Sequence, residues 1–425
     1  MAGSDISTPI KPKVRAWPVL YNRNYALLFC GQFVSAIGTQ VQIVAVAWQV
    51  YLLTHSAVAL GIIGLLQAVP RIIFSLVGGV SADAFDRRKL LLLVQSLLAT
   101  LSTVLALCTV FHVINLFIVY GVVLLAASVS AFDFPTRQAI LPNLVSHDQR
   151  SHALSLFMLM GQLSGIIGPA IGGFVIAWFG LATSYWLDAI SYGVVIASLF
   201  FMVLPPIPLE KRARAGIASL LEGWRFLRTR PVILSIITLD FFAVLFGAPF
   251  ALLPIFASAV LHVGAQGLGI LLAANSIGAF ALTPFVRRIG RIKRQGLGIV
   301  LAILVWGLCI IAFGLFPFSL WLSVLLVAGA GAADMVSMIL RFLVIQLITP
   351  DEFRGRIGAV NAMFAFSGTQ LGQLESGVVA SFTSPQFSVI SGGAICILAT
   401  IVLVACVPGL LRVQVKDAVA IEQPE

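Results

Sequence analysis

Residues 79–89 read GVSADAFDRRK and run from the end of one long apolar segment to the start of the next. The first segment covers residues 58–82 and the second covers residues 90–111. Each is close to the roughly 20 residues with which a helix crosses a bilayer. Arg87, Arg88 and Lys89 lie between them, and basic side chains of membrane proteins stay on the cytoplasmic side. This stretch therefore predicts a short cytoplasmic loop between two membrane-spanning helices.

The same pattern of apolar segments and loops repeats along the whole chain. Six loops contain no Lys, Arg, Asp or Glu, and they alternate with loops and ends that hold nearly all of the basic residues. The alternation predicts both chain ends in the cytoplasm, which requires an even number of crossings. We expect about twelve spans, at residues 25–53, 58–82, 90–111, 116–135, 153–179, 185–204, 232–260, 268–285, 297–315, 320–345, 359–382 and 389–411.

Composition places the chain in the membrane and excludes several functions. It is 60% hydrophobic and 10% charged, whereas a soluble protein carries about 25% charged residues. The net charge of +10 follows from basic loops that face an anionic lipid surface, so we expect no nucleic-acid partner. The cysteines lie inside apolar segments, the histidines are scattered, and no Walker-type loop is present. These patterns argue against a metal, a cofactor, a membrane enzyme and an ATP-driven pump.

Two halves of the chain resemble each other. Arg137, Gly161 and Gly165 recur as Arg341, Gly368 and Gly372, with a polar turn and a helix start between the Arg and the Gly residues. Repeated halves of six spans are an architecture of secondary transporters. We therefore predict an all-α membrane protein of two pseudo-symmetric six-helix bundles. Its parts are a cytoplasmic tail (1–24), an N-terminal bundle (25–204), a cytoplasmic linker with an amphipathic helix (205–231), a C-terminal bundle (232–411) and a cytoplasmic tail (412–425).

Residues 79–89 also resemble the signature loop of the major facilitator superfamily, a Gly, an Asp four residues later and then a basic cluster. Gly79, Asp83, Arg87 and Arg88 match this pattern, and Asp86 stands where Gly is common. The resemblance implies a gating role, in which Asp83 faces a helix N-terminus and Arg87 pairs with an acid on an adjacent span. A simple charge cluster that stops transfer would explain the basic residues but not the Gly and Asp.

The fifth apolar segment resembles the motif of antiporter members of this superfamily. It contains Gly161, Gly165, Gly168, Pro169, Gly172 and Gly173. Small residues at this spacing also form a face for close helix packing, and Pro169 allows a bend. The motif favours export over import.

Four further stretches, 132–138, 333–337, 349–356 and 374–377, resemble the branch that contains the bacterial enterobactin exporter and related efflux proteins. The resemblance covers residues 22–411. It implies a monomer in a bacterial inner membrane that exports a small organic solute, siderophore-like or drug-like, by alternating access and proton antiport. An uptake facilitator and a non-transporting sensor on the same fold stay open as alternatives.

Ionisable side chains inside spans are expensive and usually functional. Glu375 is our first candidate for proton coupling, followed by Asp240 and Asp334, and a bridge between Glu375 and Arg71 is the alternative. Asp133 and Arg137 share a helix face, as do Asp334 and Arg341, so both pairs are candidate ion pairs. Asp188 lies near the outer end of its span, where we expect it to reach water.

A polar stripe marks one side of the first span. It consists of Gln32, Ser35, Thr39, Gln42 and Gln49, and Asn275 and Gln370 are weaker candidates of the same kind. Such side chains line a cavity or form hydrogen bonds between helices, and the sequence leaves both alternatives open.

Overall fold

The computed structural model describes residues 17–84, 86–202 and 217–412. Every regular element in these ranges is helical, as expected where no water can satisfy backbone groups. The fold is the predicted all-α one. The predicted tails and linker fall partly outside the described residues, at 1–16, 203–216 and 413–425, and so does Phe85 of the signature loop.

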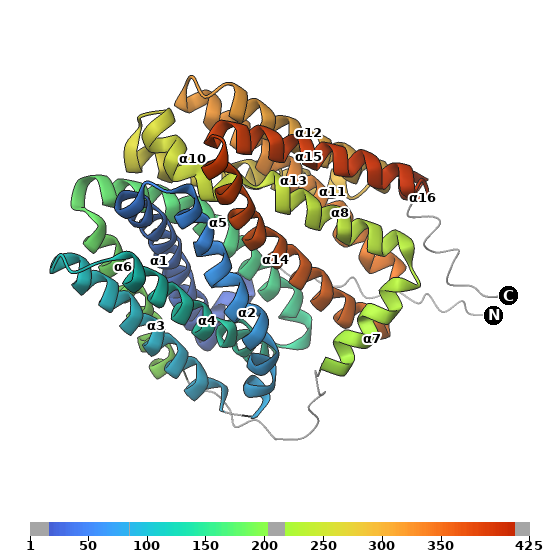
Figure 1. Cartoon of the computed structure of the whole chain (residues 1–425). Helices are drawn as coiled ribbons and strands as arrows, with labels where there is room; N and C mark the ends of the chain where they lie inside the picture. Colours follow the sequence, from blue (N-terminus) through green and yellow to red (C-terminus); the bar gives the residue numbers. More distant parts are fainter. Residues whose placement is uncertain (1–16, 85, 203–216, 413–425) are drawn as a thin grey trace, which may run out of the picture.

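The chain forms two groups of helices (Figure 1). The first group contains η1 (Trp17–Tyr21), α1 (Arg23–Thr54), α2 (Ala57–Ala84), α3 (Arg87–Val110), α4 (Leu116–Leu144), η2 (His147–Gln149), α5 (Arg150–Phe179) and α6 (Leu181–Phe201). The second contains α8 (Pro231–Gly247), η3 (Pro249–Leu252), α9 (Leu253–Ile255), η4 (Phe256–Val260), α10 (Gly264–Ala281), η5 (Thr283–Phe285), α11 (Val286–Ile289), α12 (Gln295–Leu315), α13 (Leu320–Ile348), α14 (Asp351–Phe382), α15 (Pro385–Cys406) and α16 (Gly409–Arg412). We call these groups the N bundle and the C bundle.

Eleven segments of the described chain are long and apolar enough to cross a membrane. The remaining long helix, α14, has 32 residues and is therefore long enough to cross. It is less apolar because Gln370, Gln373 and Glu375 lie in its second half. With α14 the fold has the expected twelve spans.

The predicted spans differ from the helices mainly at prolines. The seventh span, expected over 232–260, is one segment over Pro231–Val260, but its helix is interrupted after Gly247 and the segment consists of α8, η3, α9 and the π-helical turn η4. Pro249 has no N–H to donate, so the α-helical hydrogen bonds are interrupted there. In contrast, α4 continues through Pro135 to Leu144, although we expected the fourth span to end at that proline.

The amphipathic helix predicted in the linker is α7 (Ile217–Arg228). Its Phe226 ring stacks on Phe353 of α14 with ring centroids 4.5 Å apart. Glu222 forms an ion pair with Arg356 of α14 at 3.0 Å. The helix therefore packs on the C bundle and does not merely lie on the lipid surface.

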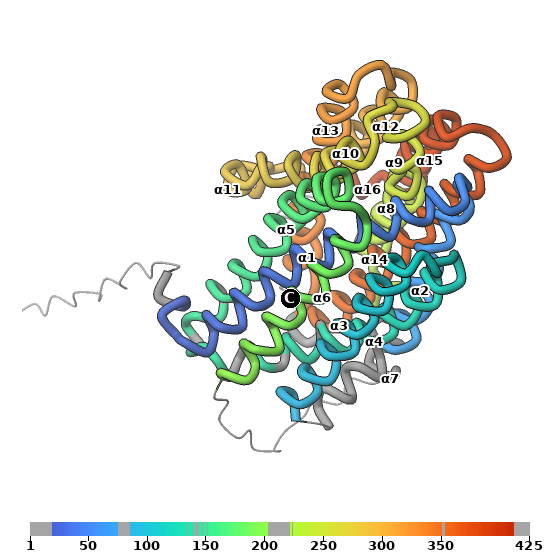
Figure 2. Tube along the Cα trace, turned by 90° about the vertical axis from the view of Figure 1, so that its left-hand side faces the viewer, coloured from blue at the N-terminus to red at the C-terminus, as the bar shows by residue number. Residues whose placement is uncertain are grey.

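The two bundles meet through two helix pairs. α5 packs on α10, and α2 packs on α14. Figure 2 shows α5 beside α1 and extending towards α10. Within the bundles, α1 packs on α5 and α6, and α8 packs on α14 and α15.

The loops divide the molecule into two ends. We call the end with loops near residues 55, 111–115, 179–184, 261–267, 316–319 and 383–388 the uncharged end, because these loops lack Lys, Arg, Asp and Glu. The opposite end, with the basic loops and α7, is the basic end. Figure 1 shows α2 and α3 diverging from α8 and α15 towards the basic end.

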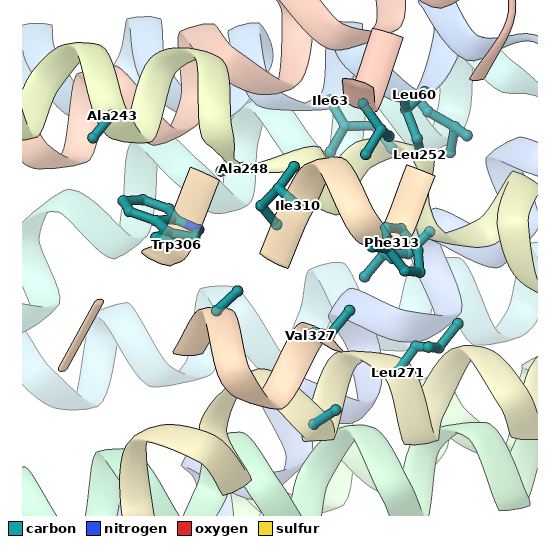
Figure 3. Packing of buried hydrophobic residues seen from close by; sticks show 14 of the residues in the cluster. Leu60, Ile63, Ala243, Ala248, Leu252, Leu271, Trp306, Ile310, Phe313 and Val327 are labelled. Carbon is teal, nitrogen blue, oxygen red and sulfur yellow. The ribbon is translucent and has the colours of Figure 1, made fainter. Parts of the chain in front are cut away.

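The buried core follows the same asymmetry. One large cluster joins residues of both bundles, and Figure 3 shows Leu60 and Ile63 of α2 beside Leu252 of η3. A separate cluster near the basic end contains only residues of the N bundle, among them Tyr25, Leu91 and Leu199. The bundles therefore share a core towards the uncharged end and have separate packing at the basic end.

Candidate functional site

A cavity of about 320 Å³ lies between the two bundles. Its apolar wall includes Leu60, Ile63, Phe250, Leu268 and Leu272. The polar side chains in the wall are Thr39, Gln42, Gln67, Arg71, Ser130, Tyr192, Gln370 and Gln373. We call this space the central cavity. An apolar wall with a few polar groups is typical of sites that hold small organic molecules.

Among the described residues that line the central cavity, the charged side chain is that of Arg71 on α2. Its guanidinium lies 4.3 Å from the ring centroid of Phe366 on α14 and 3.5 Å from Ser130 Oγ on α4. It forms no ion pair with Glu375 in the described part of the chain, so the alternative of a bridge between these two residues is not realised in this structure. Arg71 instead connects the two bundles through an aromatic ring.

Paired glycines bring the bundles together at the uncharged end. Gly173 of α5 faces Gly269 of α10, and a Cβ on Gly173 would lie 2.6 Å from Ala265 O and 2.9 Å from Gly269 Cα. Gly61 of α2 faces Gly377 of α14, and a Cβ on Gly61 would lie 2.8 Å from Gln373 O. We call these two contacts the glycine seams. No side chain fits in either seam, so the backbones of the two bundles touch towards the uncharged end.

The antiporter-like motif divides its residues between two neighbours of α5. Gly168 and Gly172 pack against α1, at Gln40 and Val41. Gly165 and Gly173 face α10 of the other bundle, at Ser276 and Gly269, and the carbonyl of Pro169 lies against Gly269. Gly161 has no neighbouring atom within 4 Å of the position of a Cβ. The predicted packing face is therefore two faces, one within the N bundle and one between the bundles.

The N bundle contains the ion pair expected from the spacing of Asp133 and Arg137. Arg137 Nε donates to Asp133 Oδ1 at 2.8 Å, and a second guanidinium nitrogen contacts Oδ2. Gln95 Nε2 of α3 also donates to Asp133 Oδ1, at 2.8 Å. The pair thus ties α4 to α3 near the basic end.

The C bundle contains a larger charge cluster than the sequence indicated. Arg341 of α13 forms an ion pair with Asp240 of α8, and it lies 3.7 Å from Asp334 on its own helix. The sequence indicated the pair of Arg341 with Asp334 but not the pairing of Arg341 with Asp240. All three residues border a second cavity of about 400 Å³ between α8, α13 and α14, which we call the C-bundle cavity.

Glu375 lies half-buried on α14. One turn before it, Gly372 packs against the backbone of α8 at Leu245, and Gly368 packs against Phe241. Among the described residues Glu375 forms neither an ion pair nor a hydrogen bond. Of the three coupling candidates it is the one without a cationic partner in that part of the chain.

The polar stripe of α1 serves two different purposes. Thr39 and Gln42 line the central cavity, and so does Gln370. Gln32 and Ser35 are buried inside the N bundle away from the cavity, at 0% and 2% exposure. Asn275 packs against Gly331 of α13 and is not part of the cavity wall. Gln49 is also buried and accepts a hydrogen bond from Tyr185 of α6, so this part of the stripe packs between helices.

The expectation that Asp188 reaches water is wrong. Its side chain is fully buried, and Ser102 Oγ of α3 donates to Asp188 Oδ2 at 2.6 Å. The residues that surround it, Gly38 on α1 and Ser102 on α3, are far away in sequence. In the sequence, only the presence of small and polar residues on three separate spans could have indicated that Asp188 is buried.

The signature loop is described in part. Gly79 and Asp83 lie in α2, but their side chains fall outside the described atoms. Asp86 caps α3, because its Oδ1 accepts from the backbone N–H groups of Arg88 and Lys89 at 2.9 and 3.3 Å. Arg88 donates to Phe200 O of α6 at 3.0 Å. The Asp at position 86 therefore starts α3, a role that the usual Gly would fill less well.

Curated relatives of this chain include exporters. The chain is 29% identical over 371 residues to the enterobactin exporter EntS of Shigella boydii serotype 18, covering 87% of this chain and 88% of that protein. The same values hold for EntS of Escherichia coli O1:K1.

Solved structures share the fold at low sequence identity. A bacterial homologue of the human lysosomal transporter Spinster superposes with a TM-score of 0.69 at 14% identity, covering 95% of this chain and 99% of that one. A POT family transporter superposes with a TM-score of 0.71 at 14% identity, covering 91% of this chain and 96% of that one.

The family model that describes transmembrane secretion effectors matches residues 14–423. The match covers nearly the whole chain and agrees with two six-helix bundles around a central cavity. The chain is a multi-pass membrane transporter that belongs to the transmembrane secretion effector family of the major facilitator superfamily.

Proposed function

We propose that this transporter exports a small organic solute across a bacterial inner membrane by alternating access, driven by inward flow of protons. The central cavity between two bundles that touch through the glycine seams is the observation that carries this proposal, in which the seams are the closed gate. Basic loops stay in the cytoplasm, so the uncharged end faces the periplasm and both chain ends are cytoplasmic. The solute then enters from the cytoplasm and leaves when the seams separate.

The cavity wall favours a particular kind of solute. Arg71 offers a positive charge, and Gln42, Gln67, Gln370 and Gln373 offer amide donors and acceptors among apolar side chains. Arg71 lies in an environment of low dielectric constant, where its attraction for an anion is much stronger than in water. A solute with an acidic or phenolic group on an apolar body fits this wall. The names of the curated relatives point to siderophore export, which is consistent with such chemistry.

Proton coupling is assigned to Glu375, with Asp240 and Asp334 next. Removal from water penalises the charged form of a carboxyl, and no cation compensates Glu375 in the described chain. Arg341 neutralises part of the charge on the other two acids. Glu375 therefore gains the most from binding a proton.

Inside-out membrane vesicles provide the test. Their lumen corresponds to the periplasm, so export is measured as solute uptake into the lumen, and an acidic lumen drives it. A panel of fluorescent dyes and a catecholate is offered to vesicles with wild-type protein, with Glu375→Gln, and without the transporter. We expect uptake of at least one panel member by wild type only, and its loss when a protonophore removes the pH gradient.

The controls separate coupling from transport. Glu375→Gln should still exchange labelled for unlabelled solute at equal concentrations, because that exchange needs no net proton movement. Uphill uptake by wild type that survives the protonophore would refute proton coupling. Equal uphill uptake by wild type and Glu375→Gln would remove Glu375 from the proposed mechanism.

A further inference from the structure

Asp188 is a carboxyl that the proposed mechanism does not use. It lies on α6 where α1 and α3 pack against that helix, and its side chain has 0% exposure. Given the rise of an α-helix, it sits roughly 10 Å below the start of α6 at the uncharged end. Within the described chain it forms no ion pair. It is thus an isolated acid inside the N bundle.

Two hydrogen bonds separate this acid from the central cavity. Ser102 Oγ donates to Asp188 Oδ2 at 2.6 Å, and Gln42 Nε2 donates to Ser102 Oγ at 2.8 Å. Gln42 lines the cavity. Beside this path, the hydroxyl groups of Thr39 and Tyr192, which also line the cavity, lie 3.2 Å apart. The acid is closed off from water by one amide side chain and one hydroxyl.

The second carboxyl oxygen of Asp188 has no hydrogen-bond partner in the described structure. Gly38 of α1 faces it, and a Cβ there would lie 3.1 Å from Oδ1. The carboxyl can therefore accept a proton on Oδ1 without loss of the hydrogen bond that Ser102 donates to Oδ2. A purely structural role would be filled by an amide or a hydroxyl, which avoids burying an ionisable group.

The charges around Asp188 do not fix whether its carboxyl group is protonated. α1 presents Gly38 and Gln42 to it, α3 presents Ser102, and α6 itself contributes the tyrosine Tyr192. Asp133 and Arg137 of α4, whose charges act on Tyr192, form an ion pair with each other. Protonation of Asp188 is therefore governed by its contact with the cavity.

We propose that Asp188 is a proton-binding site of the N bundle, which exchanges its proton with water in the central cavity through Ser102 when Gln42 moves aside. Ser102 then gives its hydroxyl proton to Asp188 Oδ2 and takes one from cavity water. A half-turn of the carboxyl group leaves the proton on the oxygen that has no partner, and Ser102 again donates to the other oxygen. Its use as a second carrier besides Glu375 rests on the proposed proton-driven export. The proton site itself does not depend on that function.

Infrared spectroscopy tests the site without any solute. The full-length protein in lipid nanodiscs is titrated with acid and base, and the carbonyl stretch of protonated carboxyl groups is recorded. We expect a band that appears on acidification in wild type and is lost in Asp188→Asn. The matched control, Glu375→Gln, should keep that band. Ser102→Ala should keep it at a higher frequency, because a hydrogen bond to the carboxyl weakens its carbonyl bond.

Three results would overturn the proposal. They are a spectrum of Asp188→Asn identical to wild type, an Asp188 band that does not change with pH, and a Ser102→Ala band at the wild-type frequency. If Asp188→Asn does not fold, the frequency of the Ser102→Ala band decides whether the proposal holds. Vesicle transport separates the two proposals: a titrating Asp188 band with no pH-driven uptake would refute the export proposal alone, and the reverse outcome would refute this one alone.

Discussion

Arg341 and Asp240 form an ion pair at a site that water hardly reaches, with side-chain exposures of 9% and 6%. The pair connects α13 to α8, and Asp334 lies near the same guanidinium. Burial removes the hydration of both charges, so each depends on the other for compensation. The pair contributes to the packing of the C bundle as long as both members are present.

Asp240→Asn should destabilise the protein by about 3 kcal/mol, because it leaves the Arg341 charge buried with only Asp334 near it. The double variant Asp240→Asn/Arg341→Gln should recover most of that loss, since it removes both charges. Thermal unfolding in detergent, followed by tryptophan fluorescence, measures the difference. A double variant less stable than the single one would contradict this account of the pair.

Arg71 should determine which solutes bind in the central cavity. In Arg71→Gln we expect the KM for anionic panel members to rise about tenfold or more, which corresponds to about 1.4 kcal/mol. Neutral members should be little affected, because Phe366 and the amide side chains remain. Arg71→Lys is the matched control and keeps the charge without the planar guanidinium. An equal loss for neutral and anionic solutes would show that Arg71 is structural.

Individual residues were predicted well where their partners lie on the same helix. The pairing of Asp133 with Arg137 follows from a spacing of one helical turn. The partners of Asp240, Asp188 and Arg71 lie on other helices, and a single sequence does not say which helix faces which. The errors at these residues have that common cause.

At the scale of helices, the glycine seams decide which end of the cavity is closed. Gly173 with Gly269, and Gly61 with Gly377, allow the backbones of opposite bundles to touch. Any side chain in a seam would force the helices apart. The sequence indicated a packing face on α5 but not its division between α1 and α10. The spacing of glycines does not show which helix packs against them.

Gly173→Val should hold the uncharged end open. In a variant without native cysteines, Gln67→Cys reports on the central cavity through an impermeant maleimide added from the periplasmic side. We expect labelling at least tenfold faster with Gly173→Val, together with loss of transport. Gly161→Val is the control, because a Cβ there would meet no atom within 4 Å. Unchanged labelling in Gly173→Val would contradict the role of the seam.

Helix boundaries show where sequence patterns mislead. Hydropathy predicted the seventh span over 232–260, but it did not show that Pro249 interrupts the helix inside this span and that Phe250 and Pro254 lie in the cavity wall. Pro135 has no such effect on α4, whose helix continues to Leu144. A proline in the sequence therefore does not by itself show whether a helix ends there or continues through it.

For the whole molecule, the succession of long apolar segments predicted the twelve-span fold, and the alternation of basic and uncharged loops predicted its orientation. That pattern works because no water is available to backbone groups in lipid, so long apolar segments must be helices. The position of the central cavity and its closure at the uncharged end arise from contacts between bundles. They could not be derived from the order of the spans.

The orientation in the membrane has a direct test. With native cysteines removed, His112→Cys at the uncharged end should react with an impermeant maleimide in spheroplasts, which retain only the inner membrane. Lys293→Cys at the basic end should react only after the membrane is permeabilised. The two sites are both exposed, so a difference reflects sidedness. The opposite labelling pattern would reverse the proposed direction of transport.

The central claim is that solute export and proton entry are one process. It is tested most directly in proteoliposomes by recording solute flux and proton flux together, with a panel member that wild type accepts. We predict a constant ratio of protons to solute at every gradient, and no solute-dependent proton flux with Glu375→Gln. Solute transport by the wild-type protein without any accompanying proton movement would contradict the account.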